Sequence, residues 1–275
     1  MTLSTFAFAA MHACVRHLSA ELHPLQVAFF RNFFGLIVFV PLVMRSGVGF
    51  LRTQRFGLHG LRAILNVISM FMFFYALSMT PLARVTALSF TAPIFAAVLS
   101  VVLLGEQFRL RRWSAIAAGF AGTMVILRPG MIEIDAGSVL VVVSAALWGL
   151  TLIIIKVLGR TESSMTITGY MNLLLSAISL VPAIYVWQTP QPLAWGFLLA
   201  VGVLGTLGQI ALTESLRQAD TTVVLPFDFL KLVWAAVLGY LFFAELPDAL
   251  TWVGAAIVYA SGFYIAYRES VVRRR

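Results

Sequence analysis

The sequence predicts an all-α integral membrane protein with ten transmembrane helices, arranged as two inverted five-helix repeats. Of the 275 residues, 61% are hydrophobic and 11% are charged, and this charged fraction is about half that of a soluble domain. Apolar runs of about 20 residues, long enough to cross a 30 Å hydrocarbon core, recur along the whole chain. The third observation is an internal repeat that aligns the end of the first half with the end of the second.

Apolar runs separated by short polar breaks are the predicted membrane spans. The breaks carry charges, proline or glycine, as in the stretch from Arg45 to Arg55. The chain opens on an apolar run without a charged leader or a small-residue cleavage site, so we interpret this run as a membrane helix rather than a signal peptide. The predicted helices are residues 2–18, 24–45, 57–79, 82–104, 112–128, 136–158, 165–187, 193–216, 221–243 and 249–267.

The distribution of basic residues predicts the orientation. Most of the 19 Lys and Arg residues fall at alternate ends of the predicted spans, which by the positive-inside rule face the cytoplasm. Only Arg16, Arg84 and Arg128 fall at the other ends. We therefore expect both termini in the cytoplasm. The chain has no Asn-x-Ser/Thr sequon and no organelle signal, which favours the inner (plasma) membrane of a bacterium.

The internal repeat predicts two halves of opposite orientation. A constant shift along the chain aligns Glu106 with Glu245 and Trp113 with Trp252. Each half holds five predicted spans, so the second half crosses the membrane in the opposite sense to the first. Inverted repeats of this kind occur in secondary transporters. The predicted repeats are residues 1–135 and 136–275.

The stretch from Ala87 to Glu106, A-x-S-F-T-A-P-I-F-A-A-V-L-S-V-V-L-L-G-E, carries a family resemblance. Together with the five-plus-five spans and Trp113, it resembles the drug/metabolite transporter superfamily, EamA type. The second copy departs from the pattern, with Ala244 in place of the glycine and Leu232 in place of Pro93. The length and the aromatic content are similar to those of bacterial exporters of aromatic amino acids.

The resemblance implies a basket of ten helices around a central cavity. Spans one, three, four, six, eight and nine would line the cavity, with spans five and ten behind them. Members of this superfamily move amino acids, other metabolites, drugs or nucleotide sugars without hydrolysing ATP. Small residues four apart, such as Ala118 with Gly122 and Ala256 with Ala260, separately predict close packing of spans five and ten.

The ninth predicted span carries Pro226, Asp228 and Lys231 inside an apolar run. Each charged side chain costs about 2.5–3.5 kcal/mol near the centre of a membrane helix. Such residues therefore usually have a partner or a function. Asp228 and Lys231 are three residues apart and share a helix face. One interpretation is an interhelical salt bridge. We favour the other, a polar path through the membrane, because the repeat aligns these residues with the uncharged Ser89 and Ala92.

An amino acid substrate would suit this charged pair. Lys231 can bind its carboxylate and Asp228 its ammonium group, while Trp148, Phe90 or Tyr75 stacks on an aromatic side chain. Alternatively, Asp228 carries a coupling proton. Trp148 lies in the middle of its span, where it is either a core filler or a stacking surface.

Other polar residues inside predicted spans are weaker candidates. His12 is either a buried, hydrogen-bonded side chain or a contact for the substrate or a proton. Asn66 shares a face with Ser69 and Phe73 and serves either as interhelical glue or as a cavity residue. We expect Arg31 to extend towards the outer surface. The remaining candidates are Ser89 and Gln209 as substrate contacts, with Pro93 and Pro226 as hinges.

These observations predict an exporter of amino acids, with aromatic ones favoured, that works by alternating access. The alternatives are another substrate class, a lipid flippase, a channel or a membrane-embedded enzyme. No His-rich, Asp-rich or Gly-rich motif supports an enzyme, and the single Cys14 excludes an internal disulfide. We expect no cofactor, no metal and no nucleic acid, since topology explains the net charge of +8. The expected partners are a small-molecule substrate and membrane lipids, for a monomer or weak homodimer.

Overall fold

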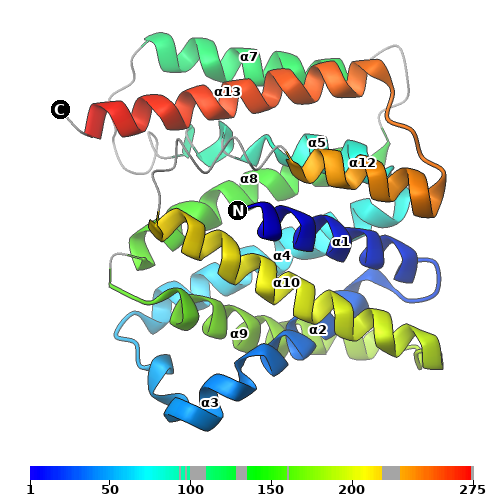
Figure 1. The fold of residues 1–275 in the computed structure, drawn as a ribbon, viewed down its shortest axis with the longest axis vertical. Helices are drawn as coiled ribbons and strands as arrows, with labels where there is room; N and C mark the ends of the chain where they lie inside the picture. Colours follow the sequence, from blue (N-terminus) through cyan, green and yellow to red (C-terminus); the bar gives the residue numbers. More distant parts are fainter. Residues whose placement is uncertain are drawn as a thin grey trace.

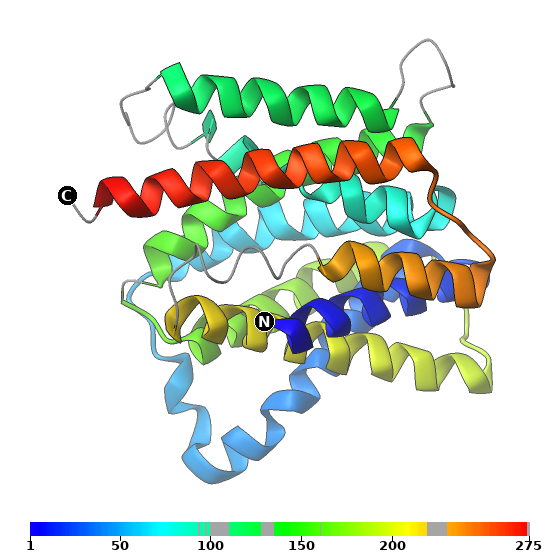
Figure 2. The same cartoon turned by 45° about the horizontal axis from the view of Figure 1, so that its top comes forward.

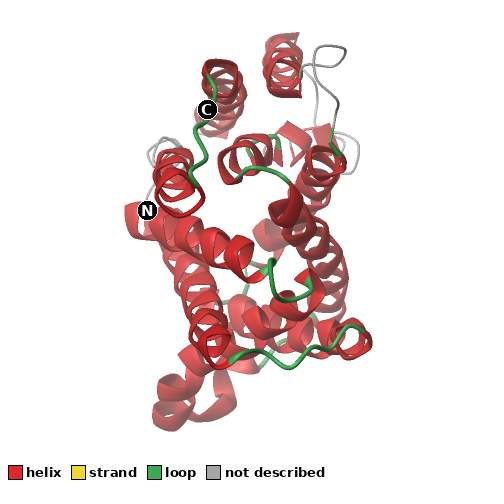
Figure 3. Cartoon of the chain, turned by 90° about the vertical axis from the view of Figure 1, so that its right-hand side faces the viewer, coloured by secondary structure: helices red, strands yellow, loops and turns green. Residues whose placement is uncertain are grey.

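The computed structural model describes residues 1–92, 94–96, 98–99, 110–127, 135–159, 161–218 and 230–273. All regular elements in these ranges are helices, which confirms the all-α prediction (Figures 1 and 3). They are α1 (Thr2–Leu18), α2 (Pro24–Gly35), η1 (Leu36–Phe39), α3 (Val40–Ser46), η2 (Gly47–Leu51), α4 (Phe56–Met79), α5 (Leu82–Ser89), α7 (Leu110–Leu127), α8 (Ala136–Leu158), α9 (Ser164–Tyr185), α10 (Pro192–Gln218), α12 (Leu230–Phe243) and α13 (Ala249–Arg273).

Several helices are long and apolar enough to cross a membrane. They are Pro24–Arg45, Phe56–Met79, Ala136–Ile155, Ser164–Tyr185 and Pro192–Leu212. Shorter apolar helices include α12 and the segments Ala117–Ile126 and Ala249–Ser261. The predicted runs 2–18 and 136–158 have the same bounds as α1 and α8. Of the predicted run 221–243, the structure describes only the part from Leu230 onward.

The second predicted run is not one regular α-helix. After α2 the chain tightens into the 3₁₀ helix η1 and then continues as α3. Pro41 lies at the start of α3, and it cannot donate the backbone hydrogen bond that a regular α-helix would make there. This change of geometry lets α3 project away from the bundle at the bottom of Figure 1.

The fourth predicted run also differs from a continuous helix. α5 ends at Ser89, and the chain makes a turn at Phe90 and Thr91 before it becomes helical again at Ala92. The hydroxyls of Thr86, Ser89 and Thr91 each donate to a carbonyl three or four residues earlier. Such bonds compete with the regular backbone pattern and commonly bend helices.

The bundle is built around α1 and α4. α1 packs against α10, α12 and α4, while α4 packs against α8 and α9. α2 lies against α9 and α10. The largest cluster of buried apolar side chains extends across these helices and includes Val15, Val27, Leu77 and Leu88.

α7 and α13 form a separate layer. They pack against each other and against α5, and Figures 1 and 2 show them along one edge of the molecule. Glycines set their separation: a Cβ atom on Gly254 would lie 2.7 Å from the backbone oxygen of Gly122 and 2.5 Å from the Ile126 side chain. The close packing that the small residues predicted is therefore confirmed for this pair.

Two glycine-to-alanine variants test this packing. Gly254→Ala should lower the free energy of unfolding by about 1–3 kcal/mol, because the added methyl group forces α7 and α13 apart. Gly196→Ala on α10 is the matched control: a Cβ atom there meets nothing within 4 Å, so the variant should gain helix stability. The measurement is thermal unfolding in detergent. Equal melting temperatures for the two variants would contradict the proposed role of Gly254.

Candidate substrate-binding site

Three basic side chains from three helices meet in the middle of the bundle. His12 comes from α1, Arg31 from α2 and Lys231 from the first turn of α12. The positive charges of Lys231 and Arg31 both act on the His12 ring, so the three groups lie within electrostatic range of one another. We call His12, Arg31 and Lys231 the central cluster. Positive charges this close in an apolar bundle favour an anionic group between them.

Aromatic rings surround the central cluster. The His12 ring lies between Phe8 and Phe73, with ring centroids 6.4 and 4.9 Å away. The Lys231 ammonium nitrogen lies 5.6 Å from the centroid of the Phe8 ring, within range of a cation–π interaction. The site therefore combines positive charge with flat apolar surfaces, which suits a ligand that carries both a negative group and a ring.

The structure buries Arg31, and the expectation that it extends to the outer surface is wrong. Its side chain is 8% exposed, and its guanidinium donates to the Asn32 side chain at 2.8 Å and to the sulfur of Met70 at 3.8 Å. Gly205 of α10 allows this arrangement, because a Cβ atom there would lie 3.2 Å from the Arg31 side chain. Within the described ranges, no carboxylate forms an ion pair with Arg31.

Other residues expected at the site lie elsewhere or point to other partners. The Tyr75 hydroxyl is 2.6 Å from His23 in the connection between α1 and α2. Ser89 donates to the carbonyl of Thr86 in its own helix. Phe90 is buried against Tyr259 of α13, with ring centroids 6.1 Å apart. The structure thus brings together His12 and Lys231 but not these three residues.

The remaining expected site residues lie on helices that pack around α4 or outside the described ranges. Asn66 is buried on α4, and Gln209 is buried on α10. Trp148 is half-buried on α8. Asp228 and the two proposed hinges, Pro93 and Pro226, lie outside the described residues. The sequence interpretation missed Phe8 and Arg31, although the polar pair Arg31–Asn32 inside an apolar run was a signal for a buried polar site.

One end of α4 is tied to neighbouring helices by charged contacts. Arg16 at the end of α1 donates to the carbonyls of Leu77 and Thr80 and pairs with Glu245 after α12. Glu245 also accepts a hydrogen bond from the backbone nitrogen of Leu82, at 3.0 Å. We call this the Arg16 end. Both members of this ion pair are about four-fifths buried, and the pair connects α1 and α5 to α12.

A second carboxylate, Asp135, stabilises the Arg16 end. It caps α8 by accepting from the backbone nitrogen of Ser138, at 2.7 Å, and it also accepts from Thr80. Arg84 pairs with it at 3.1 Å. Partial burial opposes ionisation of this carboxyl, but the hydrogen bonds from Thr80 and Ser138 and the charge of Arg84 outweigh that effect and lower its pKa.

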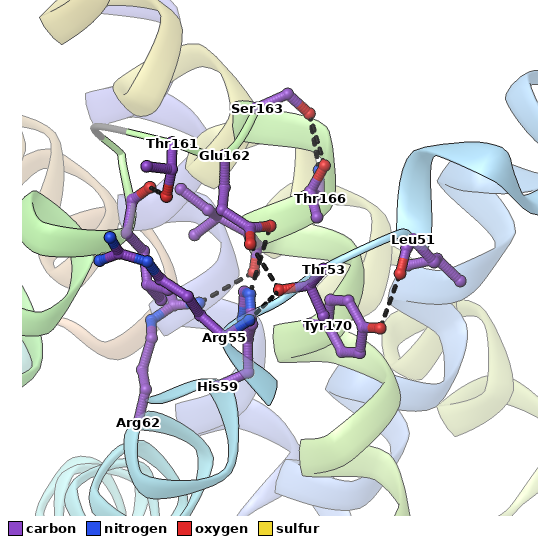
Figure 4. A network of polar contacts seen from close by, with 12 residues as sticks. Leu51, Thr53, Arg55, His59, Arg62, Thr161, Glu162, Ser163, Thr166 and Tyr170 are labelled. Atoms are coloured by element: carbon purple, nitrogen blue, oxygen red, sulfur yellow. Dashed lines mark hydrogen bonds and ion pairs between the residues drawn. The ribbon is translucent and has the colours of Figure 1, made fainter. Parts of the chain in front are cut away.

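The opposite end of α4 carries a network of polar side chains, shown in Figure 4. His59 at the start of α4 lies 3.5 Å from Glu162 in the connection between α8 and α9. Glu162 also accepts a hydrogen bond from Thr53. Tyr170 of α9 donates to the carbonyl of Leu51, at 2.7 Å. We call this the His59 end.

Comparisons with known proteins point to a family of transporters. The EamA-like transporter family matches residues 1–128 and 135–267. An S-adenosylmethionine uptake transporter of Rickettsia felis is 31% identical over 99% of this chain and 93% of its own length. A riboflavin transporter of Vibrio cholerae is 32% identical over 100% of this chain and 94% of its own length. A pseudopaline exporter of Pseudomonas aeruginosa is 28% identical over 93% of this chain and 90% of its own length.

A solved structure also resembles this chain. Its TM-score is 0.64 and its sequence identity is 18%, with 99% of this chain and 98% of that chain covered. At this identity the likeness supports the fold alone.

The lowered pKa of Asp135 predicts a dependence of stability on acid. A carboxyl group whose pKa is lowered by folding stabilises the folded protein fully at pH values above its pKa in the unfolded state, which is near 4. This stabilisation is lost as the pH falls through the pKa of the folded state. Asp135→Asn keeps a helix cap but removes the charge. The difference in melting temperature between wild type and this variant should therefore shrink as the pH falls from 7 to 3. A difference that stays constant over this range would contradict the assignment.

Proposed function

We propose that this chain, which belongs to the EamA-like transporter family, is a secondary transporter of a small metabolite. The relatives named above are transporters, which supports a multi-pass membrane transporter rather than an enzyme. Our proposal adds that residues 1–135 and 136–275 are two inverted five-helix halves that alternate the access of a central site. The family match to one segment in each half supports this division.

We place the transporter in the inner membrane of a bacterium, with both termini in the cytoplasm. The clustering of Lys and Arg at alternate span ends supports this orientation. In Figure 1, α1 leads away from the N-terminus to the right, and α13 runs to the left towards the C-terminus. The His59 end then faces the cytoplasm and the Arg16 end faces outward. Small residues on α7 and α13 leave room for a weak homodimer as well as a monomer.

The central cluster is the observation that carries the proposal. Arg31 and Lys231 supply positive charge, while His12, Phe8 and Phe73 supply ring surfaces. We propose a substrate that joins an aromatic or heteroaromatic ring to a carboxylate or another anionic group. The ring would lie against Phe73 and His12, and Lys231 would bind the anionic group. Asp228 remains our proposed partner for a substrate ammonium group.

This substrate class is broader than aromatic amino acids. The relatives described above act on S-adenosylmethionine, riboflavin and pseudopaline, and their names include both uptake and export. S-adenosylmethionine and riboflavin each contain a heteroaromatic ring, which fits the ring surfaces of the site. Export of an aromatic amino acid is one member of the proposed class. Trp148, Asn66, Tyr75, Ser89, Phe90 and Gln209 stay proposed contacts, and Pro93 and Pro226 stay proposed hinges.

Counterflow in proteoliposomes tests the proposed substrate class. We expect the wild type to exchange at least one of labelled riboflavin, S-adenosylmethionine and phenylalanine. Lys231→Ala should lower exchange of S-adenosylmethionine or phenylalanine by about 10–100-fold, because a hydrogen bond to their carboxylate is lost. Riboflavin has a ring but no anionic group, so its exchange tests the ring surfaces alone. Lys231→Arg should keep part of the activity. Arg52→Ala, which removes a basic side chain on the exposed surface, should exchange at the wild-type rate.

Two outcomes would count against this proposal. Exchange by folded Lys231→Ala at the wild-type rate would make Lys231 a structural residue. Failure of the folded wild type to exchange any of the three compounds would remove the proposed substrate class.

A further inference from the structure

One face of α4 connects the His59 end to the central cluster. His59, Arg62, Asn66, Met70 and Phe73 follow one another at intervals of three or four residues, so they share a helix face. At one end of this face, Phe73 contacts His12 and the sulfur of Met70 accepts from Arg31. At the other end, the charge of Arg62 acts on Arg31, and His59 meets Glu162.

Buried polar atoms without hydrogen bonds concentrate along this face. An unpaired buried polar atom destabilises a folded protein unless water, an ion or a proton compensates. On α4, Arg62 and Asn66 each keep one nitrogen without a partner among the described residues, although both side chains are at most 5% exposed. In the α8–α9 connection and on α9, the atoms without a hydrogen bond within the described ranges include atoms of Glu162, Ser164, Thr168 and Asn172.

The pair of His59 and Glu162 is the titratable part of this face. The side chains are 0% and 6% exposed, and their nearest nitrogen and oxygen are 3.5 Å apart. The pair carries opposite charges only when His59 is protonated. Thr53 donates a hydrogen bond to the other oxygen of Glu162. The His59 ring also stacks on Tyr170, with centroids 4.5 Å apart.

Groups around His59 have opposing effects on the protonation of its ring. Glu162 favours a proton on the ring, while burial and the positive charge of Arg62 disfavour it. The surrounding titratable or charged groups are Arg55 before α4, Arg62 on α4, Tyr170 on α9 and Glu162 in the α8–α9 connection. The Lys156 side chain on α8 lies outside the described part, and the charge of Arg31 on α2 acts on Arg62. At the opposite end of α4, Arg16 on α1 donates to the carbonyl of Leu77, and Arg84 on α5 pairs with Asp135.

We propose that the His59–Glu162 pair binds the proton to which transport is coupled. The proton lies on the His59 imidazolium and leaves to cytoplasmic water, with a neutral imidazole and a carboxylate left behind. With the proton bound, the ion pair joins α4 of the first half to the α8–α9 connection of the second half and closes this end. Without it, the buried carboxylate lacks its counter-charge, so separation and hydration of the two side chains become favourable.

The face of α4 links this proton to the substrate. Opening of the His59 end moves α4, and α4 also carries Met70 and Phe73, which contact Arg31 and His12 of the central cluster. Loss of the proton therefore changes both the access to the site and the positions of two of its neighbours. This inference rests on the proposed transport function, so its test needs one measurement that does not require a substrate.

The substrate-free test measures the accessibility of a thiol at the His59 end. Cys14→Ser removes the native thiol, and Ser164→Cys places one at a buried position next to the pair. The rate of alkylation by N-ethylmaleimide is measured in inverted membrane vesicles between pH 5.5 and 8. Each rate is divided by the rate of a His59→Gln variant at the same pH. This ratio removes the effect of pH on the ionisation of the thiol itself. We expect this ratio to fall about tenfold from pH 8 to pH 5.5. A constant ratio would overturn the proposal.

The coupling test separates exchange from accumulation. The probe is riboflavin, S-adenosylmethionine or phenylalanine, whichever the wild type exchanges. A one-unit pH difference should drive about tenfold accumulation by the wild type if one proton moves with each molecule. His59→Gln and Glu162→Gln should keep counterflow at equal pH but lose this accumulation, whereas the exposed control His17→Gln should keep both. In Glu162→Gln, the side-chain amide oxygen can still accept a hydrogen bond from Thr53. This variant therefore provides the test if His59→Gln does not fold.

The outcomes distinguish the two proposals. Accumulation that persists in folded His59→Gln and Glu162→Gln would overturn the proton site and leave the transport function intact. Absence of counterflow in the wild type would overturn the proposed substrate class, while the thiol measurement would still decide whether His59 and Glu162 bind a proton that closes this end.

Discussion

The burial of the polar face of α4 is the constraint on which the rest of the structure depends. A bilayer offers no hydrogen-bond partner to Arg62 or Asn66, so this face has to turn inward and the surrounding helices have to cover it. α8 and α9 cover it near the His59 end, and α1 and α2 cover it near the centre. Arg62 donates to the carbonyl of Ile167 at 2.8 Å, which fixes the distance between α4 and α9. The packing of the bundle therefore follows from the need to satisfy one buried helix face.

Close approach of the helices supports this arrangement. Gly35 and Gly202 let α2 and α10 come so near that a Cβ atom on Gly202 would lie 2.8 Å from the backbone nitrogen of Gly35. Next to this crossing, Asn172 donates to Thr206 at 2.9 Å. Lipid chains are as apolar as leucine, so tight packing and hydrogen bonds of this kind, rather than burial of apolar surface, hold membrane helices together. They keep Arg31 buried beside the central cluster.

Helix positions could be predicted from the sequence far better than the contacts between helices. The bounds of α1 and α8 match the predicted runs because hydropathy depends on composition alone. The 3₁₀ turn before Pro41 and the turn at Phe90 escaped prediction because neither interrupts the hydropathy of its run enough to divide it. His12 and Lys231 could be found because a charge inside an apolar run stands out. Phe8 could not, since one phenylalanine among 22 has no pattern that tells a site residue from a core residue.

The two ends of α4 differ in how they respond to protons, and this difference gives the proposed mechanism its direction. At the Arg16 end, the ion pair joins a guanidinium to the Glu245 carboxylate and contains no histidine. His59 can hold or release a proton, and its pair with Glu162 joins opposite charges only while the ring is protonated. A change in cytoplasmic pH therefore alters the free energy of opening at the His59 end and leaves the Arg16 end unchanged. A carrier that alternates between two closed ends needs such an asymmetry to convert a proton gradient into directed movement, because a proton that stabilised closure of both ends equally would favour neither.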